Sequence, residues 1–73
     1  MTPDDFKAWR KSMGMTQTEA GDALGVSKGT IINYEAGKRR DDGRTVEIPK
    51  TVALACTAVA KGLGPWPNEK PAS

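Results

Sequence analysis

Residues 16–37, TQTEAGDALGVSKGTIINYEAG, carry the start and stop signals of two short helices. The first start signal is a capping box, in which the Thr16 hydroxyl and the Glu19 carboxylate each accept a hydrogen bond from a free backbone amide. This pair predicts a helix over residues 17–24. Because Gly25 is the residue type best able to adopt a positive φ past a helix end, the helix should stop there.

A second helix should begin almost at once. Ser27 can cap it and Gly37 can end it, which predicts a helix over residues 28–36. Two helices joined by so short a break must cross steeply and touch, so they need a small residue where they meet. Gly21 supplies that residue. The apolar residues around it are Ala20, Leu24, Val26, Ile31 and Tyr34.

Another helix is expected before this stretch. Thr2 offers a hydroxyl cap, Pro3 suits the first helical position, and the two acidic residues that follow favour the positive end of the helix dipole. Apolar residues then recur at spacings of three and four, which predicts one buried stripe on a helix that ends at Met13. The stripe consists of Phe6, Trp9 and Met13, so we expect Trp9 in the core.

The last expected helix, from Pro49 to about Lys61, is apolar on nearly every side. If Val52, Cys56 and Val59 face the core, a second apolar stripe is left that one small domain cannot cover. That stripe consists of Leu54, Ala55, Ala58 and Leu63, and a second copy of the chain could cover it as a dimer interface. The sequence does not decide which stripe faces inward, so Val52 and Leu54 can exchange roles.

Two segments carry no helix signal. Residues 38–45 are charged, with a turn expected at Asp42-Gly43, and should form an ordered loop at most. Residues 64–73 form a proline-rich tail after a domain expected to span residues 1–63. Three roles stay open for Trp66 in this tail: a lid on the core, a dimer contact, or part of a disordered end.

The composition indicates one small domain without a strong bulk charge. The chain has 73 residues and a formal net charge of +2, so any basic surface depends on where the charges lie. Its single cysteine, Cys56, excludes an internal disulfide and lies in an apolar run, where a buried and inert thiol is expected. We also expect a cytoplasmic protein without a leader or a membrane span, because the longest apolar run is far shorter than the ~20 residues that a span needs.

A set of residues in register surrounds the two central helices. It consists of Arg10, Met15-Thr16-Gln17, Gly21, Leu24-Gly25-Val26-Ser27, Thr30-Ile31, Tyr34-Glu35 and Gly37-Lys38-Arg39. In this spacing the chain resembles the Cro/CI-type (Xre-like) helix-turn-helix repressors of phages and mobile elements, over roughly residues 5–40. The resemblance implies an all-α fold: a small four- or five-helix bundle of lambda-repressor-like type with a central helix-turn-helix. It also implies a partly buried ion pair between Arg10 and Glu35.

The second helix of such a motif reads DNA bases. With about 3.6 residues per turn, burial of Ile31 and Tyr34 turns the opposite face of the helix outward. The base contacts expected on that face are Lys28, Gly29, Ile32 and Asn33. Lysine can donate to guanine, asparagine can pair with adenine through two hydrogen bonds, and isoleucine can lie on a thymine methyl. Gly29 departs from the family, in which a long polar side chain is common at that position. One base-contacting side chain is therefore missing here.

Phosphate contacts are expected around the same helix. The resemblance assigns Gln17 and Ser27 to phosphates or to bracing the first reading residue, and both have a simpler role at helix starts. The flanking cations can neutralise phosphates, although such charges can also form only a solvated surface. The expected set is Gln17, Ser27, Thr30, Lys38, Arg39, Arg40 and Arg44.

Two functions fit these features. The first is a sequence-specific transcriptional regulator, a repressor that binds double-stranded DNA as a homodimer on a palindromic operator. The second is an antitoxin-type protein-interaction module whose last helix covers a protein partner and which also binds its own promoter. An enzyme is not expected, because the sequence has no histidine, no second cysteine and no glycine-rich phosphate loop. We therefore expect no catalytic residue, metal or cofactor.

Overall fold

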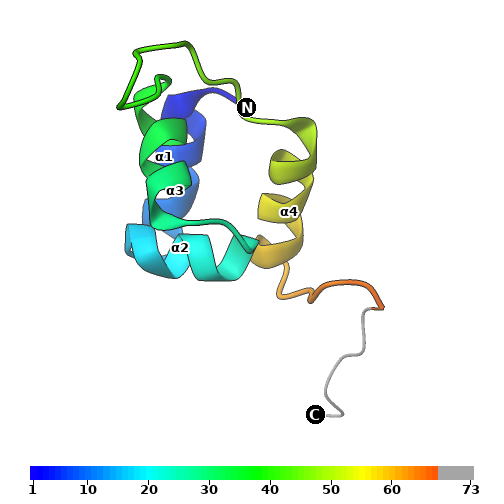
Figure 1. Ribbon diagram of the computed structural model, residues 1–73. Helices are drawn as coiled ribbons and strands as arrows, with labels where there is room; N and C mark the ends of the chain where they lie inside the picture. The colour runs from blue at the N-terminus through cyan, green and yellow to red at the C-terminus, as the bar shows by residue number, and fades with distance from the viewer. Residues whose placement is uncertain (68–73) are drawn as a thin grey trace.

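The computed structural model describes residues 1–67, and this part of the chain folds into helices, the first three joined by short segments and the last preceded by a longer segment over residues 37–49 (Figure 1). The helices are α1 (Pro3–Ser12), α2 (Gln17–Leu24), α3 (Lys28–Ala36) and α4 (Lys50–Ala60). The expected all-α bundle is therefore confirmed, with four helices in the described residues. Of the expected tail over residues 64–73, residues 68–73 lie outside the description.

The helix ends follow the capping signals. Thr2 and Thr16 each accept a hydrogen bond from the backbone amide three residues on, at 3.0 and 3.1 Å, and each belongs to a complete capping box. The predicted bounds of α2 and α3 are those observed. At the outer helices Met13, Pro49 and Lys61 are flanking caps rather than helical residues. The Met13 amide still donates to the Trp9 carbonyl at 3.0 Å, and Pro49 has an extended backbone while its carbonyl accepts from the Ala53 amide at 3.2 Å, as expected of half-helical cap positions.

The junction of α2 and α3 requires a residue without a side chain. Gly25 ends α2 with φ of +76°, and the backbone amide of Val26 then donates to the Gly21 carbonyl at 2.9 Å. A Cβ atom on Gly21 would lie 2.6 Å from the Val26 carbonyl oxygen, closer than packed atoms can approach. Gly21 therefore permits the close, steep crossing of α2 and α3 (Figure 1).

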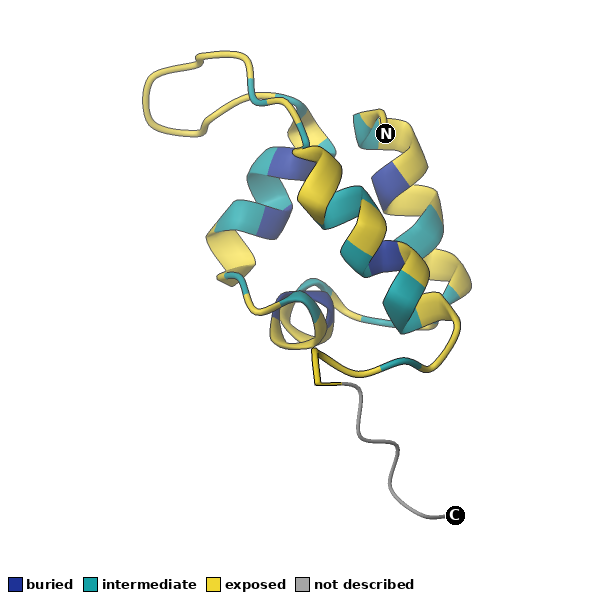
Figure 2. Ribbon diagram, turned by 90° about the vertical axis from the view of Figure 1, so that its right-hand side faces the viewer, coloured by how far each residue is buried: buried dark blue, intermediate teal, exposed yellow. Residues whose placement is uncertain are grey.

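The core lies where the helices converge, and Figure 2 shows buried positions on each of them. It consists of Phe6, Ala20, Ile31, Tyr34 and Cys56. The Phe6 ring packs against both Trp9 and Tyr34, with ring centroids 5.5 and 5.6 Å apart. Of the expected α1 stripe only Phe6 lies in the core: Trp9 is half-buried and packs against it, and Met13 is half-buried outside this cluster. The Trp9 indole Nε1 donates to the Cys56 carbonyl at 3.1 Å, which joins α1 to α4.

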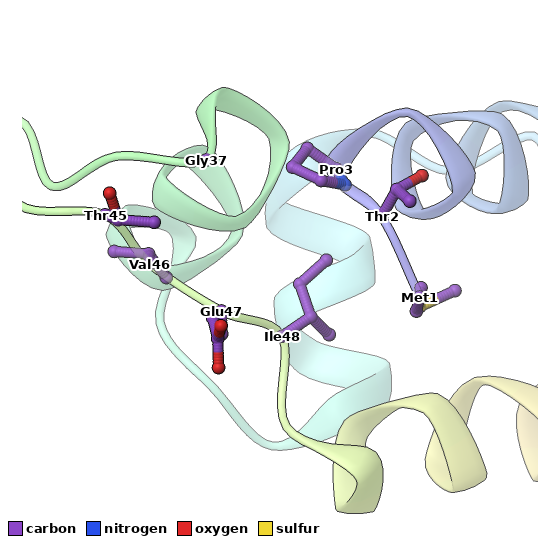
Figure 3. Close-up of a pocket in the computed structure, with 8 residues that line it drawn as sticks. All are labelled: Met1, Thr2, Pro3, Gly37, Thr45, Val46, Glu47 and Ile48. Atoms are coloured by element: carbon purple, nitrogen blue, oxygen red, sulfur yellow. The ribbon is translucent and has the colours of Figure 1, made fainter.

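The segment after α3 is fastened to the bundle before it reaches α4. Figure 3 shows Gly37, Pro3 and residues 45–48 around one shallow hollow beside the first residues of the chain. The Val46 amide donates to the Gly37 carbonyl at 3.0 Å, and both Val46 and Ile48 pack against the core. Residues 38–45 are consequently held at their base while remaining exposed along their length (Figure 2).

Candidate nucleic-acid interface

The α3 helix presents one face to the core and the other to solvent. Ile31 is fully buried and Tyr34 nearly so, whereas Lys28 and Gly29 are exposed. Ser27 caps the helix by accepting from the Thr30 amide at 3.1 Å, and the hydroxyls of these two residues are 2.9 Å apart. The first turn of α3 therefore projects outward with its cap complete.

Ile32 and Asn33, also expected on the outward face, are only half exposed. The side-chain oxygen of Asn33 is buried and has no hydrogen-bond partner among the described residues. An asparagine pairs with adenine only if its oxygen and its nitrogen both reach the base edge. The Asn33 amide must therefore turn before it can make that contact, and a partner for its oxygen would remove the cost of an unsatisfied buried acceptor.

An ion pair fixes α3 against α1. Arg10 donates from Nε to Glu35 at 2.5 Å and from a second nitrogen at 3.1 Å, and it also donates to the Met15 carbonyl at 2.9 Å. The Arg10 and Glu35 side chains are 13% and 7% exposed. The expected partly buried ion pair is confirmed, and it ties the end of α3 to α1 and to the segment that leads into α2.

The electrostatics of this pair favour its charged form. Burial by itself raises the pKa of Glu35, but the hydrogen bonds and the charge of Arg10 outweigh burial and bring that pKa below its usual value. The hydrogen bond to Glu35 likewise raises the pKa of Arg10. Gln17 adds a third donor to the cluster, from Nε2 to Glu35 at 3.4 Å, a structural contact that the sequence analysis missed. Gln17 thus couples the first residue of α2 to α3.

Several cations flank α3 at its two ends. Lys28, Lys38 and Arg40 are exposed and have no ion pair within residues 1–67. Lys28 begins α3 and Lys38 follows its last turn. These side chains are therefore free to approach an anionic surface from both ends of the helix.

The segment 38–45 forms a small hairpin, more ordered than the loop that the sequence predicts. Lys38 and Thr45 form an isolated antiparallel bridge, and the Arg39 amide donates to the Arg44 carbonyl at 2.8 Å. The turn at Asp42-Gly43 is present, with Gly43 at φ of +70°. We call residues 38–45 the hairpin from here on.

The hairpin arginines have carboxylate partners. Arg39 lies 3.3 Å from Asp41 and 3.7 Å from Asp42, and Arg44 lies 3.5 Å from Asp42. The hydrogen bond to Asp41 raises the pKa of Arg39 and lowers that of Asp41. Both arginines are therefore paired within the chain, unlike the other cations around α3.

The structure decides the orientation of α4. Val52 and Cys56 face the core, whereas Leu54 is 61% exposed and Ala55, Ala58 and Leu63 are half-buried. Val59, expected to face the core with the first two, is half-buried and lines the outer hollow instead. The residues of this outer face border a hollow of about 590 Å³ between α2, α4 and the following segment. Its lining has no charged residue: Ala23, Leu24, Thr51, Leu54, Ala55, Ala58, Val59, Leu63, Gly64, Pro65 and Trp66. Trp66 is 90% exposed, which excludes the expected alternative of a lid on the core.

Other kinds of site find little support in the described residues. Burial raises the pKa of the Cys56 thiol, which disfavours the reactive thiolate. Between residues 1 and 67 there is no cluster of three or more metal-ligating side chains. No helix in this part of the chain is long and apolar enough to cross a membrane.

A protein-family model described as helix-turn-helix matches residues 6–46, which contain α2, α3, most of α1 and the whole hairpin. The match thus covers the capped helix pair, the Arg10–Glu35 pair and all the cations described around α3. Comparison with curated proteins and with solved structures found no match.

Proposed function

Because this chain belongs to the helix-turn-helix family of Cro/CI-type DNA-binding regulators, we propose that it acts as a homodimeric repressor on a two-fold symmetric operator. Membership of this family makes the chain a DNA-binding transcription regulator. Two features of the same chain support the homodimeric repressor: the first turn of α3 points outward, and α4 has an apolar face that no other part of the described chain covers. Occupancy of a promoter by such a dimer would block polymerase without any catalytic step.

The major groove would receive the outer face of α3. On this face Lys28 can donate to guanine O6 or N7, Asn33 can pair with adenine, and Ile32 can contact a thymine methyl. Gly29 adds no contact of its own, but a helix without a side chain there can approach the base edges more closely. The base contacts that we propose are Lys28, Gly29, Ile32 and Asn33.

The backbone phosphates would be held from both sides of α3. Free cations lie at its start and after its end, and the Ser27 cap places a hydroxyl and the first α3 amides at the positive end of the helix dipole. Gln17 can keep its weak contact with Glu35 and still offer an amide hydrogen to a phosphate, since an amide nitrogen carries two donors. The proposed phosphate contacts are Gln17, Ser27, Thr30, Lys38, Arg39, Arg40 and Arg44.

A second copy of the chain is the occupant that we propose for the hollow on α4. The hollow is apolar and uncharged, and Leu54 and Trp66 stand beside it with most of their surface exposed. A two-fold contact would bury these side chains of each copy against the other. It would also set two α3 helices about 34 Å apart, one turn of the duplex, and so join two weak half-site contacts into one strong one.

Selection of bound fragments from random DNA by the purified protein tests this function. We expect an enriched site with two inverted half-sites whose centres lie about one helical turn apart. The mass of the protein in solution, measured in parallel, should be that of a dimer. A monomer that selects a single half-site would contradict the dimer. A monomer that selects nothing, but forms a stable complex with a neighbouring gene product, would favour the antitoxin-type module.

A further inference from the structure

The hairpin contains its own neutralising carboxylates. Four of its side chains are cationic and two are acidic, and the acidic pair is placed between Arg39 and Arg44 rather than toward Lys38 or Arg40. Two of the cations assigned to phosphates are therefore occupied in the free protein. The remaining two have no ion pair within the described residues.

The backbone of the hairpin holds these carboxylates in place. Asp41 accepts from the amide of Asp42 at 2.8 Å, and Asp42 accepts from the amide of Arg44 at 3.0 Å. The bridge between Lys38 and Thr45 closes the base. As long as the turn persists, Asp41 and Asp42 stay beside the two arginines.

We infer that Asp41 and Asp42 are internal competitors for DNA phosphate: they hold Arg39 and Arg44 in the free protein and yield them when phosphate oxygens take their place. This inference rests on the proposed function, because it requires the hairpin to lie against the duplex. The exchange is feasible, since all four side chains are well exposed and exposed ion pairs are weak.

The competition has a consequence for specificity. A phosphate that must displace a carboxylate contributes less to binding than one that meets a free cation. The phosphate contribution is the part of the affinity that does not depend on sequence. Asp41 and Asp42 thus lower binding to every duplex alike and leave more of the discrimination to the base contacts of α3.

The substitutions Asp41→Asn and Asp42→Asn test this competition. Asparagine keeps the oxygen that accepts from the backbone amide, so the turn is retained while the charge is lost. We expect each substitution to raise affinity for a duplex of unrelated sequence about twofold to fivefold at low salt, the fold-change of one exposed ion pair. The plot of log affinity against log salt should become steeper by up to about one unit.

A matched control is Asp22→Asn, which removes an exposed carboxylate of α2 that has no ion pair within residues 1–67. This change has the same effect on net charge, so its influence on affinity measures the general electrostatic contribution. If Asp41→Asn and Asp42→Asn raise affinity no more than Asp22→Asn, the inference is wrong.

The Arg39→Ala background gives the sharper result. There Asp41→Asn should lose its effect, because no arginine remains for the carboxylate to hold, and Asp42→Asn should lose most of its effect in Arg44→Ala. An undiminished rise in these backgrounds would overturn the competition while leaving the proposed function intact. Failure of the wild type to bind any duplex would overturn both. Circular dichroism of each variant verifies that the helices are retained.

Discussion

The helix-turn-helix and the segment that follows it differ in how many of their polar, charged and apolar groups find a partner within the chain. In α2 and α3 the helix starts are capped, the junction is closed on Gly21, and the single charged pair is shielded by both helices and α1. From residue 38 onward the chain instead exposes a charged hairpin and an apolar face of α4. Apart from the buried Asn33 oxygen, the first region is completed by contacts within the chain, whereas the second leaves charges and an apolar surface exposed to solvent.

This difference separates two kinds of substitution. A change in the capped helix pair should act on the free energy of unfolding and reach DNA binding only through it. A change in the outer face of α4, or on the outer face of α3, should leave the fold stable and act on association. The following predictions test that separation, starting with the largest expected effect.

Arg10→Ala should destabilise the fold by about 3–5 kcal/mol, because it leaves the carboxylate of Glu35 buried without its partner. Urea unfolding at neutral pH measures this loss. The control Arg40→Ala removes an exposed arginine with no ion pair in the described residues and should change stability by less than about 0.5 kcal/mol. If Arg10→Ala unfolds like the wild type and yet loses DNA, Arg10 contacts phosphate and its structural role is wrong.

Leu54→Glu should separate the dimer and lower operator affinity on the order of 100-fold, because two linked half-site contacts become independent. Stability should hardly change, since Leu54 is 61% exposed in the single chain. Analytical ultracentrifugation and operator titration measure the two effects together. Thr57→Glu places the same charge on an exposed position of α4 that does not line the hollow, and it should leave the dimer intact. Equal behaviour of the two variants would refute the proposed interface.

Gly21→Ala should cost about 1–3 kcal/mol of stability, because its Cβ would lie 2.6 Å from a backbone oxygen that belongs to the tight turn. Gly29→Ala is the matched comparison. A Cβ there would meet only the Ser27 hydroxyl, at 3.8 Å, and alanine is a better helix residue, so this variant should gain about 0.5–1 kcal/mol. Thermal unfolding measures the stability of both variants. Equal stabilities would show that the crossing of α2 and α3 does not depend on Gly21.

Asn33→Ala should weaken operator binding by roughly 1–3 kcal/mol and relax the preference at one base pair in each half-site. Lys38→Ala should instead lower affinity about equally for all sequences and make the salt dependence less steep, because it removes a contact without base information. Titration of the operator and of single-base variants separates these patterns. Full specificity in Asn33→Ala would falsify the assignment of α3 as the reading helix.

The agreement between sequence and structure is best where the signals are local. Both central helices have the bounds that their caps predict, since Thr16, Ser27, Gly25 and Gly37 act within one helical turn of their own positions. The ion pair between Arg10 and Glu35, 25 residues apart, could be predicted only through the family resemblance. No local pattern in the sequence brings those two side chains together.

The base and phosphate contacts are a different case. Solvent exposure on one face of α3 follows from the helical period once Ile31 and Tyr34 are known to be buried. The buried oxygen of Asn33 and the carboxylates beside Arg39 and Arg44 do not follow from it. They depend on how side chains turn and how the hairpin closes, and a periodic pattern carries no information on either.

The sequence by itself determined the helical class, the capped pair of central helices, the glycine at their junction and the family to which the chain belongs. Only the tertiary structure decided which stripe of α4 faces inward, that Trp9 donates to the Cys56 carbonyl 47 residues away, and that Gln17 reaches Glu35. The physical reason is the distance along the chain over which each kind of interaction acts. Capping and φ preferences act between residues a few positions apart, whereas packing and long-range hydrogen bonds exist only after the helices have taken their places.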